Sequence, residues 1–208
     1  MPATRFIGRT TELAALDDLT ERSRLVTLVG PGGCGKTRLA LEHVRAAGGR
    51  RDHTGPDEDP REVAVAVVEL ATVLDGDQVA PVFLEALGAR DDPTVEPLGN
   101  LVDQLDGQVL TVLLDNCEHL VESVARVVEA VLTQRPLVRF VVTSREPLGV
   151  SGEAVYRVPS LGVPDAGASF ADAAGTDAVA LFLDRALLVR TDAAIDEREG
   201  DAVVEICR

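Results

Sequence analysis

A glycine-rich loop between an apolar run and a helical pattern constrains this chain more than any other feature. Residues 25–29 form an apolar run that contains β-branched side chains, and the loop that follows reads Gly-Pro-Gly-Gly-Cys-Gly-Lys-Thr over residues 30–37. Residues 38–45 then carry apolar side chains at helical spacing. A strand, a loop of this kind and a helix in that order predict an α/β fold.

The make-up of the loop predicts a phosphate-binding site of the Walker A type. Backbone N–H groups can surround a phosphate only where the chain turns tightly with no side chains in the way, which glycine allows. Lys36 would place its charge on the β- and γ-phosphates of a nucleotide, and the Thr37 hydroxyl would ligate Mg²⁺ at the start of the helix. The alternative is a glycine-rich turn that holds no ligand. The predicted nucleotide-binding residues of this segment are Gly30, Gly32, Gly33, Cys34, Gly35, Lys36, Thr37 and Arg38.

A second apolar run, residues 109–114, ends in an acidic residue, Asp115. This arrangement is typical of the Walker B motif, because the strand fixes the carboxylate at the carboxyl edge of the sheet, where it can hold Mg²⁺ through water. A strand-terminal aspartate without this role is the alternative.

The residues after this aspartate bear on hydrolysis. Asn116 stands where many briskly hydrolysing P-loop ATPases carry a glutamate, and an amide cannot act as a base. Glu118 is therefore the candidate catalytic base. It can equally be an acid in the first turn of the helix that the apolar spacing predicts over residues 118–133, where a negative charge favours the helix dipole.

A third apolar run, residues 138–142, is followed by two hydroxyl residues and Arg145. The end of this strand would lie at the same edge of the sheet as the glycine-rich loop. A guanidinium there can detect a γ-phosphate, because its planar fork of donors pairs with phosphate oxygens. The alternative is a surface ion pair of Arg145 with Glu146 or Glu153.

The segment before the first strand has two interpretations. Apolar residues at helical spacing predict a helix over residues 10–19, with a threonine at its N-terminus. Ahead of it, Ile7, Gly8 and Arg9 can fold back over a nucleotide base. They can equally belong to an N-terminal arm that packs on the core.

The remaining segments are predicted to be structural. Residues 48–60, which include His53, form a polar surface loop rather than a metal site. The apolar run 63–70 predicts a strand covered on both faces. Residues 78–87 and 98–105 are predicted to be connecting helices.

The charge balance limits the partners of the chain. It has 208 residues and carries 35 acidic against 20 basic residues, a formal net charge of −15, which would repel nucleic acid and anionic membrane surfaces. Three cysteines form neither an even set nor a Cys-x-x-Cys pair, which fits a reducing cytoplasm. The apolar runs are too short to indicate a signal peptide or a membrane span.

Five motifs in fixed order resemble the nucleotide-binding core of bacterial STAND ATPases. More closely, they are similar to the NB-ARC-like ATPase modules of actinobacterial LuxR-type and antibiotic-regulatory-protein transcriptional regulators. The motifs are Phe-Ile-Gly-Arg, Gly-Pro-Gly-Gly-Cys-Gly-Lys-Thr, Leu-Leu-Asp-Asn-Cys-Glu-His, Thr-Ser-Arg-Glu-Pro-Leu-Gly-Val and Val-Tyr-Arg-Val-Pro.

This resemblance implies a three-layer α/β/α P-loop NTPase fold with a mostly parallel five-stranded sheet. The strand before Arg145 would lie between the P-loop and Walker B strands. The expected domains are a nucleotide-binding domain over residues 1–160, a linker over residues 161–176 and the start of an incomplete helical lid over residues 177–208.

The resemblance also implies ATP or ADP with Mg²⁺ as cofactors. Lys36 and Thr37 would hold phosphate and metal, and Asp115 would position the metal. Arg145 would sense the γ-phosphate, and Ile7 to Arg9 would contact adenine. Such proteins are slow switches in which exchange of ADP for ATP opens a surface for self-association, while a DNA-binding domain lies elsewhere in the longer protein.

Three functions remain open on the sequence. The first is a weak ATPase that serves as the core of a regulatory switch. The second is a nucleotide-binding module that does not hydrolyse. The third is a metabolic P-loop enzyme such as a small-molecule kinase, which would need a second charged pocket, and no such cluster stands out in the sequence.

Overall fold

The computed structural model describes residues 4–48, 51–52, 61–89, 94–189 and 197–208, which form two compact units. The larger unit is Thr11–Val158, and the smaller unit joins Met1–Thr10 with Pro159–Arg208. This division differs from the one expected from the sequence, which placed the N-terminal arm with the nucleotide-binding domain. In the structure the arm groups with the C-terminal segment instead.

A five-stranded sheet forms the centre of the larger unit, and all its neighbouring strands pair in parallel. The strand that ends near Arg145 lies between the strand before the glycine-rich loop and the strand that ends in Asp115, as expected. In spatial order the strands are β4 (Ala64–Glu69), β5 (Leu110–Asp115), β6 (Val138–Ser144), β1 (Leu25–Val29) and β7 (Glu153–Arg157).

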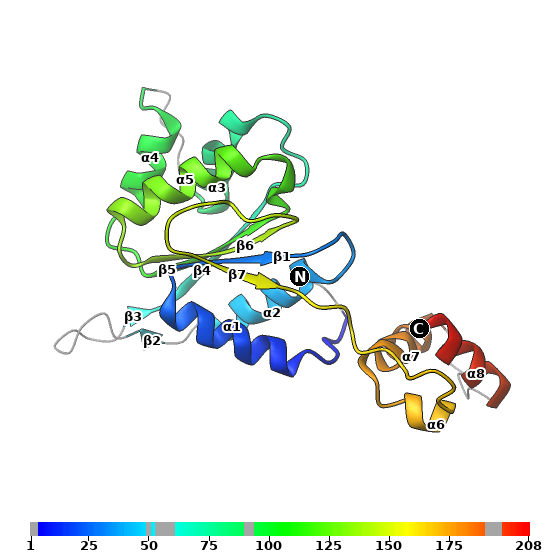
Figure 1. Ribbon diagram of the computed structural model, residues 1–208. Helices are drawn as coiled ribbons and strands as arrows, with labels where there is room; N and C mark the ends of the chain where they lie inside the picture. Colours follow the sequence, from blue (N-terminus) through cyan, green and yellow to red (C-terminus); the bar gives the residue numbers. More distant parts are fainter. Residues whose placement is uncertain (1–3, 49–50, 53–60, 90–93, 190–196) are drawn as a thin grey trace. The chain divides into compact units, whose positions relative to one another are not determined.

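Helices cover both faces of this sheet (Figure 1), which gives the predicted three-layer α/β/α fold. One face carries α1 (Thr10–Arg22) and α2 (Lys36–Ala47), and the other carries α3 (Val79–Ala86), α4 (Pro97–Gln104) and α5 (Val121–Gln134). A 3₁₀ turn, η1 (Gly76–Gln78), leads into α3. The helices predicted over residues 10–19, 78–87 and 98–105 are thus confirmed within a few residues.

The helix predicted over residues 118–133 begins later than expected. Residues Cys117–His119 form a separate 3₁₀ turn, η2, and α5 starts at Val121. The backbone is not helical on either side of this turn: Asn116 before it is left-handed with φ 69°, and Leu120 after it has φ −131°. Glu118 therefore lies in η2 and not in the first turn of the α-helix.

The main core packs the apolar stripe of α5 against the central strands. Val124, Val128 and Val131 are fully buried, and each such side chain contributes roughly 1.5 kcal/mol or more by leaving water. Phe83 from α3 meets Phe140 from β6 edge to face, with ring centroids 6.1 Å apart. This packing holds β5 and β6 rigidly, and so fixes where both strands end.

The strand β4 differs from its prediction as a strand covered on both faces. Ala66 and Val68 are buried, whereas Val65 and Val67 are only half-buried and Ala64 is exposed. The reason is its position, since β4 is the edge strand of the five-stranded sheet. Only the face of β4 that is turned toward α3 to α5 is therefore fully covered.

The smaller unit is helical. It contains α7 (Asp177–Val189) and α8 (Glu197–Ile206), with a core of Ala173, Val179, Val203 and Val204. A short helix, α6 (Phe170–Ala173), lies inside the stretch expected to be a linker, and the Ser169 hydroxyl caps it by accepting from the Asp172 N–H. Local capping thus orders a segment whose composition had indicated a connection.

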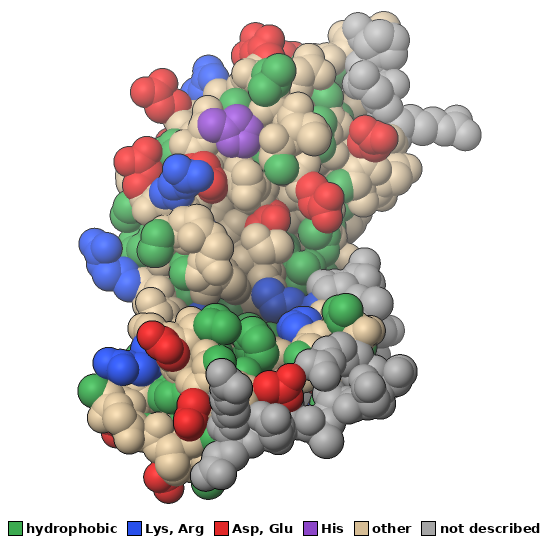
Figure 2. Space-filling view, turned by 90° about the vertical axis from the view of Figure 1, so that its right-hand side faces the viewer, with side chains coloured by type: hydrophobic (Ala, Val, Ile, Leu, Met, Phe, Trp, Pro, Cys, Tyr) green, Lys and Arg blue, Asp and Glu red, His purple; other side chains and the backbone are tan. Residues whose placement is uncertain are grey.

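Three further features complete the description. The short strands β2 (Arg51–Asp52) and β3 (Arg61–Glu62) pair in antiparallel fashion, so two residues of the segment predicted as a loop form a strand. His53 and the rest of that segment up to residue 60 lie outside the described residues. None of the helices in the described ranges combines the length and the apolar character needed to cross a membrane. Acidic side chains are spread over the face shown in Figure 2, with Lys and Arg side chains among them.

Candidate functional site

The glycine-rich loop joins β1 to α2 and has the backbone that its sequence predicts. Gly33 and Gly35 have φ 78° and 89°, a region that favours glycine, and Gly35 is the N-terminal cap of α2. A Cβ on Gly30 would lie 3.0 Å from the Cys34 sulfur, so the loop closes tightly on itself. These conformations leave the backbone of the loop without obstructing side chains.

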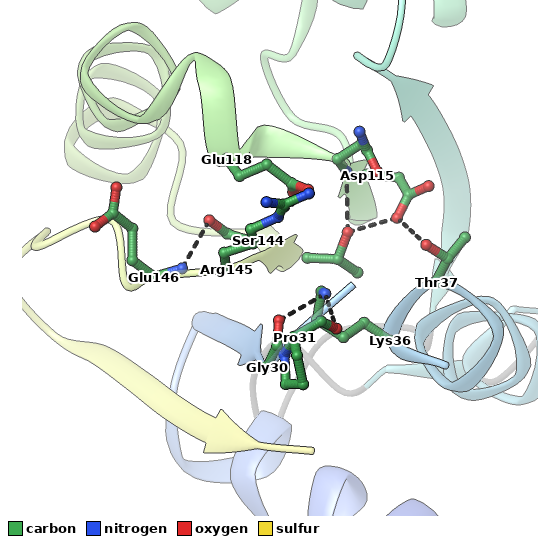
Figure 3. A network of polar contacts seen from close by, with 11 residues as sticks. Gly30, Pro31, Lys36, Thr37, Asp115, Glu118, Ser144, Arg145 and Glu146 are labelled. Atoms are coloured by element: carbon green, nitrogen blue, oxygen red, sulfur yellow. Dashed lines mark hydrogen bonds and ion pairs between the residues drawn. The ribbon is translucent and has the colours of Figure 1, made fainter. Parts of the chain in front are cut away.

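Lys36 opens α2 and its ammonium points back into the loop. Its Nζ donates to the carbonyl oxygens of Gly30 at 2.8 Å and Pro31 at 3.0 Å (Figure 3). The residue as a whole is largely buried. A cation held inside a ring of backbone groups at a helix N-terminus is suited to an anion. Arg38 lies in the same first turn of α2.

The Asp115 carboxylate gathers two hydroxyl groups at the carboxyl edge of the sheet. Its Oδ1 accepts from Thr37 Oγ1 at 2.8 Å and from Thr143 Oγ1 at 2.5 Å, and Thr143 in turn accepts from the Asn116 N–H at 2.9 Å. This set of oxygen donors has the chemistry that Mg²⁺ prefers. No group of three or more His, Cys, Asp or Glu residues suited to a metal occurs in the described part of the chain.

Arg145 follows β6 and reaches toward both the loop and η2. Its Nε donates to Glu118 Oε1 at 3.2 Å, and its Nη2 lies 3.9 Å from where a Cβ on Gly32 would stand. The sequence offered an ion pair with Glu146 or Glu153 as the alternative, whereas in the structure the guanidinium pairs with Glu118. Glu153 instead accepts from the backbone N–H groups of Leu148 and Gly149.

The two other polar residues of η2 have structural partners. Burial raises the pKa of the Cys117 thiol above its ordinary value, and the nearby Asp115 and Glu118 raise it further. A raised pKa favours the protonated thiol, which is a weaker nucleophile than the thiolate. His119 Nε2 lies 2.7 Å from the Val73 carbonyl oxygen, which ties η2 to the loop after β4.

The N-terminal residues predicted to contact adenine belong to the smaller unit. Gly8 has φ 68°, and a Cβ there would lie 2.3 Å from Asp177 Cγ. Arg9 donates from Nη2 to the Pro159 carbonyl oxygen at 3.1 Å. Ile7 precedes this contact, and the adenine role of these residues stays a prediction.

Two residues of this region escaped the sequence-based selection. Thr143 was noted only as a hydroxyl at the end of a strand, yet it links Asp115 to the backbone of Asn116. Glu69 ends β4 in register with Asp115, which places both carboxylates in one row at the same edge of the sheet. An acidic residue that ends an apolar run, as in Walker B, was the available signal for Glu69.

The sequence matches no family model. It is 36% identical over 205 residues to an uncharacterised protein of Mycobacterium tuberculosis strain H37Rv, which covers 99% of this chain and 47% of that protein. It is 35% identical over 190 residues to a second protein of that strain, provisionally named an HTH-type transcriptional regulator, which covers 91% of this chain and 19% of that protein. The chain thus spans about half or less of the length of these curated relatives.

Several solved structures share this fold at low sequence identity. Cdc6p from Pyrobaculum aerophilum superposes with a TM-score of 0.64 at 16% identity, over 99% of this chain and 56% of that chain. The Walker-type ATPase of Pyrococcus abyssi gives 0.54 at 15% identity, over 99% and 65%. The Aeropyrum pernix ORC2 protein in its ADPNP and ADP complexes gives 0.53 at 16% identity, over 90% and 54%. The chain therefore has the fold of P-loop ATPases.

Proposed function

We propose that this chain is the nucleotide-binding core of a regulatory ATPase, which binds ATP or ADP with Mg²⁺ and acts as a slow switch. One observation carries the proposal. Lys36 and Thr37 open α2, Asp115 ends β5 and Arg145 follows β6, and their side chains meet at the same glycine-rich loop (Figure 3). Sites of this composition stabilise phosphoryl transfer by position and charge.

Each group has a role in this proposal. The loop backbone and Lys36 hold the phosphates, exchanging the carbonyl contacts of the ammonium for phosphate oxygens. Thr37 and Asp115 hold Mg²⁺, whose charge neutralises the phosphate oxygens. Arg145 contacts the γ-phosphate. Gly30, Gly32, Gly33, Cys34, Gly35 and Arg38 complete the phosphate site.

Hydrolysis in this site would be slow. Water would attack the γ-phosphorus and the bond to the β,γ-bridging oxygen would break, giving ADP and phosphate. The attacking water must lose its proton, and Asn116 cannot accept it. Glu118 is the candidate acceptor, and its contact with Arg145 competes with that task. A binding module without hydrolysis remains the second candidate for the same reason.

The regulatory part of the proposal comes from the relatives. One of them is provisionally named an HTH-type transcriptional regulator, and this chain matches 19% of its length. The fold is shared with the Aeropyrum pernix ORC2 protein, whose structure is that of its ADPNP and ADP complexes. We therefore propose an NB-ARC-like module, with adenine at Ile7 to Arg9 and ATP-dependent self-association. With a net charge of −15, any contact with DNA would come from another part of a longer protein.

Thermal unfolding with Mg²⁺ and ATP, ADP or GTP tests the nucleotide assignment. Ligand at a hundredfold over its Kd adds about 2.7 kcal/mol of stability, which raises the Tm of a domain of this size by roughly 5 to 11 °C. Lys36→Ala should abolish the shift. Arg45→Ala, which removes a partly exposed charge from the last turn of the same helix, should keep it. Unchanged ATP binding by Lys36→Ala would refute the site.

A chemical label gives an independent test, because Lys36 is the single lysine of the sequence. Acetylation with an amine-reactive ester therefore modifies one side chain, which peptide mass mapping separates from the N-terminus. Mg²⁺ and ATP should slow the reaction of Lys36 and leave the N-terminus unaffected. Equal labelling with and without nucleotide would contradict phosphate binding by this residue.

Measurement of the phosphate released over hours then separates slow hydrolysis from binding alone. Phosphate transfer to a small molecule would identify a kinase.

A further inference from the structure

The guanidinium of Arg145 lies between two acceptors, one present and one proposed. On one side it donates from Nε to Glu118 Oε1 at 3.2 Å. On the other side its Nη2 lies 3.9 Å from the Cβ position of Gly32, within the loop that would hold phosphates. Figure 3 shows the Glu118 and Arg145 side chains directed at one another beside this loop. A guanidinium commonly pairs with a phosphate through two parallel N–H groups, and a pairing that includes Nε would take that donor away from Glu118.

The two partners of this ion pair differ in freedom. The Glu118 side chain is 18% exposed and that of Arg145 is 67% exposed. Glu118 is carried by η2, which is anchored by the buried Cys117 and by the contact of His119 with Val73. The carboxylate is therefore the fixed partner, and the guanidinium is the one that can move.

The second oxygen of the same carboxylate shows what such a movement would cost. Among the described residues, Glu118 Oε2 is buried and has no hydrogen-bond partner. Arg145 is consequently the side chain that compensates this carboxylate through Oε1. Withdrawal of the guanidinium would leave a mostly buried negative charge without its partner, which is unfavourable.

We infer that Glu118 competes with the γ-phosphate for Arg145 and so sets how strongly the chain prefers ATP over ADP. This inference rests on the proposed function. ADP has no γ-phosphate, so Arg145 stays on Glu118 when ADP binds. ATP must draw Arg145 away from the carboxylate, and the cost of that exchange is subtracted from its affinity. Glu118 is a positioning residue in this role, because it acts on the nucleotide through Arg145.

This role is distinct from the base that the sequence suggested for Glu118. A base changes the rate of phosphate release and leaves equilibrium affinity unchanged. A competitor changes the affinity for a γ-phosphate and leaves the affinity for ADP unchanged. The two roles are therefore separated by measuring binding with a nucleotide that is not hydrolysed.

The experiment measures the Kd of AMP-PNP and of ADP, both with Mg²⁺, by calorimetry on the full chain. Glu118→Gln keeps the size of the side chain and removes its charge. Its affinity for AMP-PNP should rise by about two- to fivefold, the range expected for a partly exposed ion pair, with no change for ADP. Glu146→Gln is the matched control, because it removes an exposed carboxylate next to Arg145 in the sequence. In the described structure this carboxylate makes no hydrogen bond or ion pair with the guanidinium, so the AMP-PNP to ADP ratio should stay unchanged.

Arg145→Ala completes a double-mutant cycle. Alone it should weaken AMP-PNP and leave ADP unchanged, because its side chain is exposed and serves the γ-phosphate. In the Arg145→Ala background, Glu118→Gln should no longer alter the AMP-PNP to ADP ratio. Such loss of the effect separates competition for the guanidinium from a general reduction of negative charge near the phosphates.

The outcomes distinguish this inference from the proposed function. If the wild-type chain binds neither AMP-PNP nor ADP, the proposed function fails. If it binds both, but Glu118→Gln changes neither affinity, or raises both equally, or keeps its effect without Arg145, the competition is refuted and the nucleotide site stands. If Glu118→Gln folds poorly, the Arg145→Ala variant still tests the inference. It alters the exposed partner of the ion pair, and its affinities for AMP-PNP and ADP are measured in the same way.

Discussion

Two buried threonines of neighbouring strands should respond in opposite ways to the same substitution. Thr143 on β6 donates to Asp115 Oδ1 and accepts from the Asn116 N–H. Thr27 on β1 is equally buried, yet within the described residues its hydroxyl has no hydrogen-bond partner. Replacing either residue by valine keeps the shape of the side chain and exchanges a hydroxyl for a methyl group.

The hydrogen bonds set the sign and size of each effect. Thr143→Val removes a bond to a carboxylate, worth about 1.5 to 3 kcal/mol, and takes the acceptor from a backbone N–H. We expect it to destabilise the larger unit by roughly 2 to 4 kcal/mol. Thr27→Val removes a hydroxyl that is buried without a partner, a condition that costs about 1 to 3 kcal/mol. It should leave the stability unchanged or raise it by up to about 2 kcal/mol.

Urea unfolding followed by tyrosine fluorescence measures both variants in the correct unit. The chain has one tyrosine, Tyr156, and it lies on β7 of the larger unit, next to β1 in the sheet. The midpoint should fall for Thr143→Val and hold or rise for Thr27→Val at constant m-value. Equal destabilisation by both substitutions would show that the hydroxyl network around Asp115 does not have the stabilising role given to it here.

Two further predictions concern backbone strain and a buried thiol. Gly8→Ala should destabilise the smaller unit by roughly 1 to 3 kcal/mol, because φ is 68° and the added Cβ would press on Asp177. Hydrogen exchange in α7 measures this, and protection equal to that of Gly175→Ala, where a Cβ meets nothing within 4 Å, would contradict it. Burial raises the pKa of Cys117 above its ordinary 9.0, so the folded state keeps the proton that the unfolded state loses. Stability should therefore decline above pH 9.0 by up to about 1.4 kcal/mol per pH unit, and Cys117→Ala should lose that part of the slope.

The arrangement of the site was accessible from the sequence because of how parallel sheets are built. Each apolar run ends in a polar residue, and the carboxyl ends of parallel strands lie at one edge. The contact between Thr37 and Asp115, which are far apart in the chain, follows from that rule once both runs are recognised as strands. The order of the strands came from the resemblance and not from the residues, since periodicity says nothing about which strand lies beside which.

Contacts that depend on the backbone conformation of a single residue could not be predicted from the sequence. The left-handed Asn116 turns the chain after β5 into a separate 3₁₀ turn, and this places Glu118 against Arg145 and not in the first turn of α5. Asparagine tolerates this conformation better than most residues, but it also occurs in many other conformations. The approach of Gly8 to Asp177 could not be predicted for a similar reason. A glycine in the sequence indicates a position where a side chain is excluded, but it does not identify the residue that excludes it.

The polar groups around the loop share one property that bears on switching. Lys36 donates to backbone carbonyl oxygens, Thr37 donates to Asp115, and Arg145 donates to Glu118. Each of these donors therefore already has an acceptor within the protein. A nucleotide would gain only the difference between its own contacts and those it replaces. Under the proposed function, ATP and ADP would replace different members of this set, so the difference between their affinities would depend chiefly on the Arg145–Glu118 pair. In such a site, a change at Glu118 alone would move the balance between the ATP-bound and ADP-bound states.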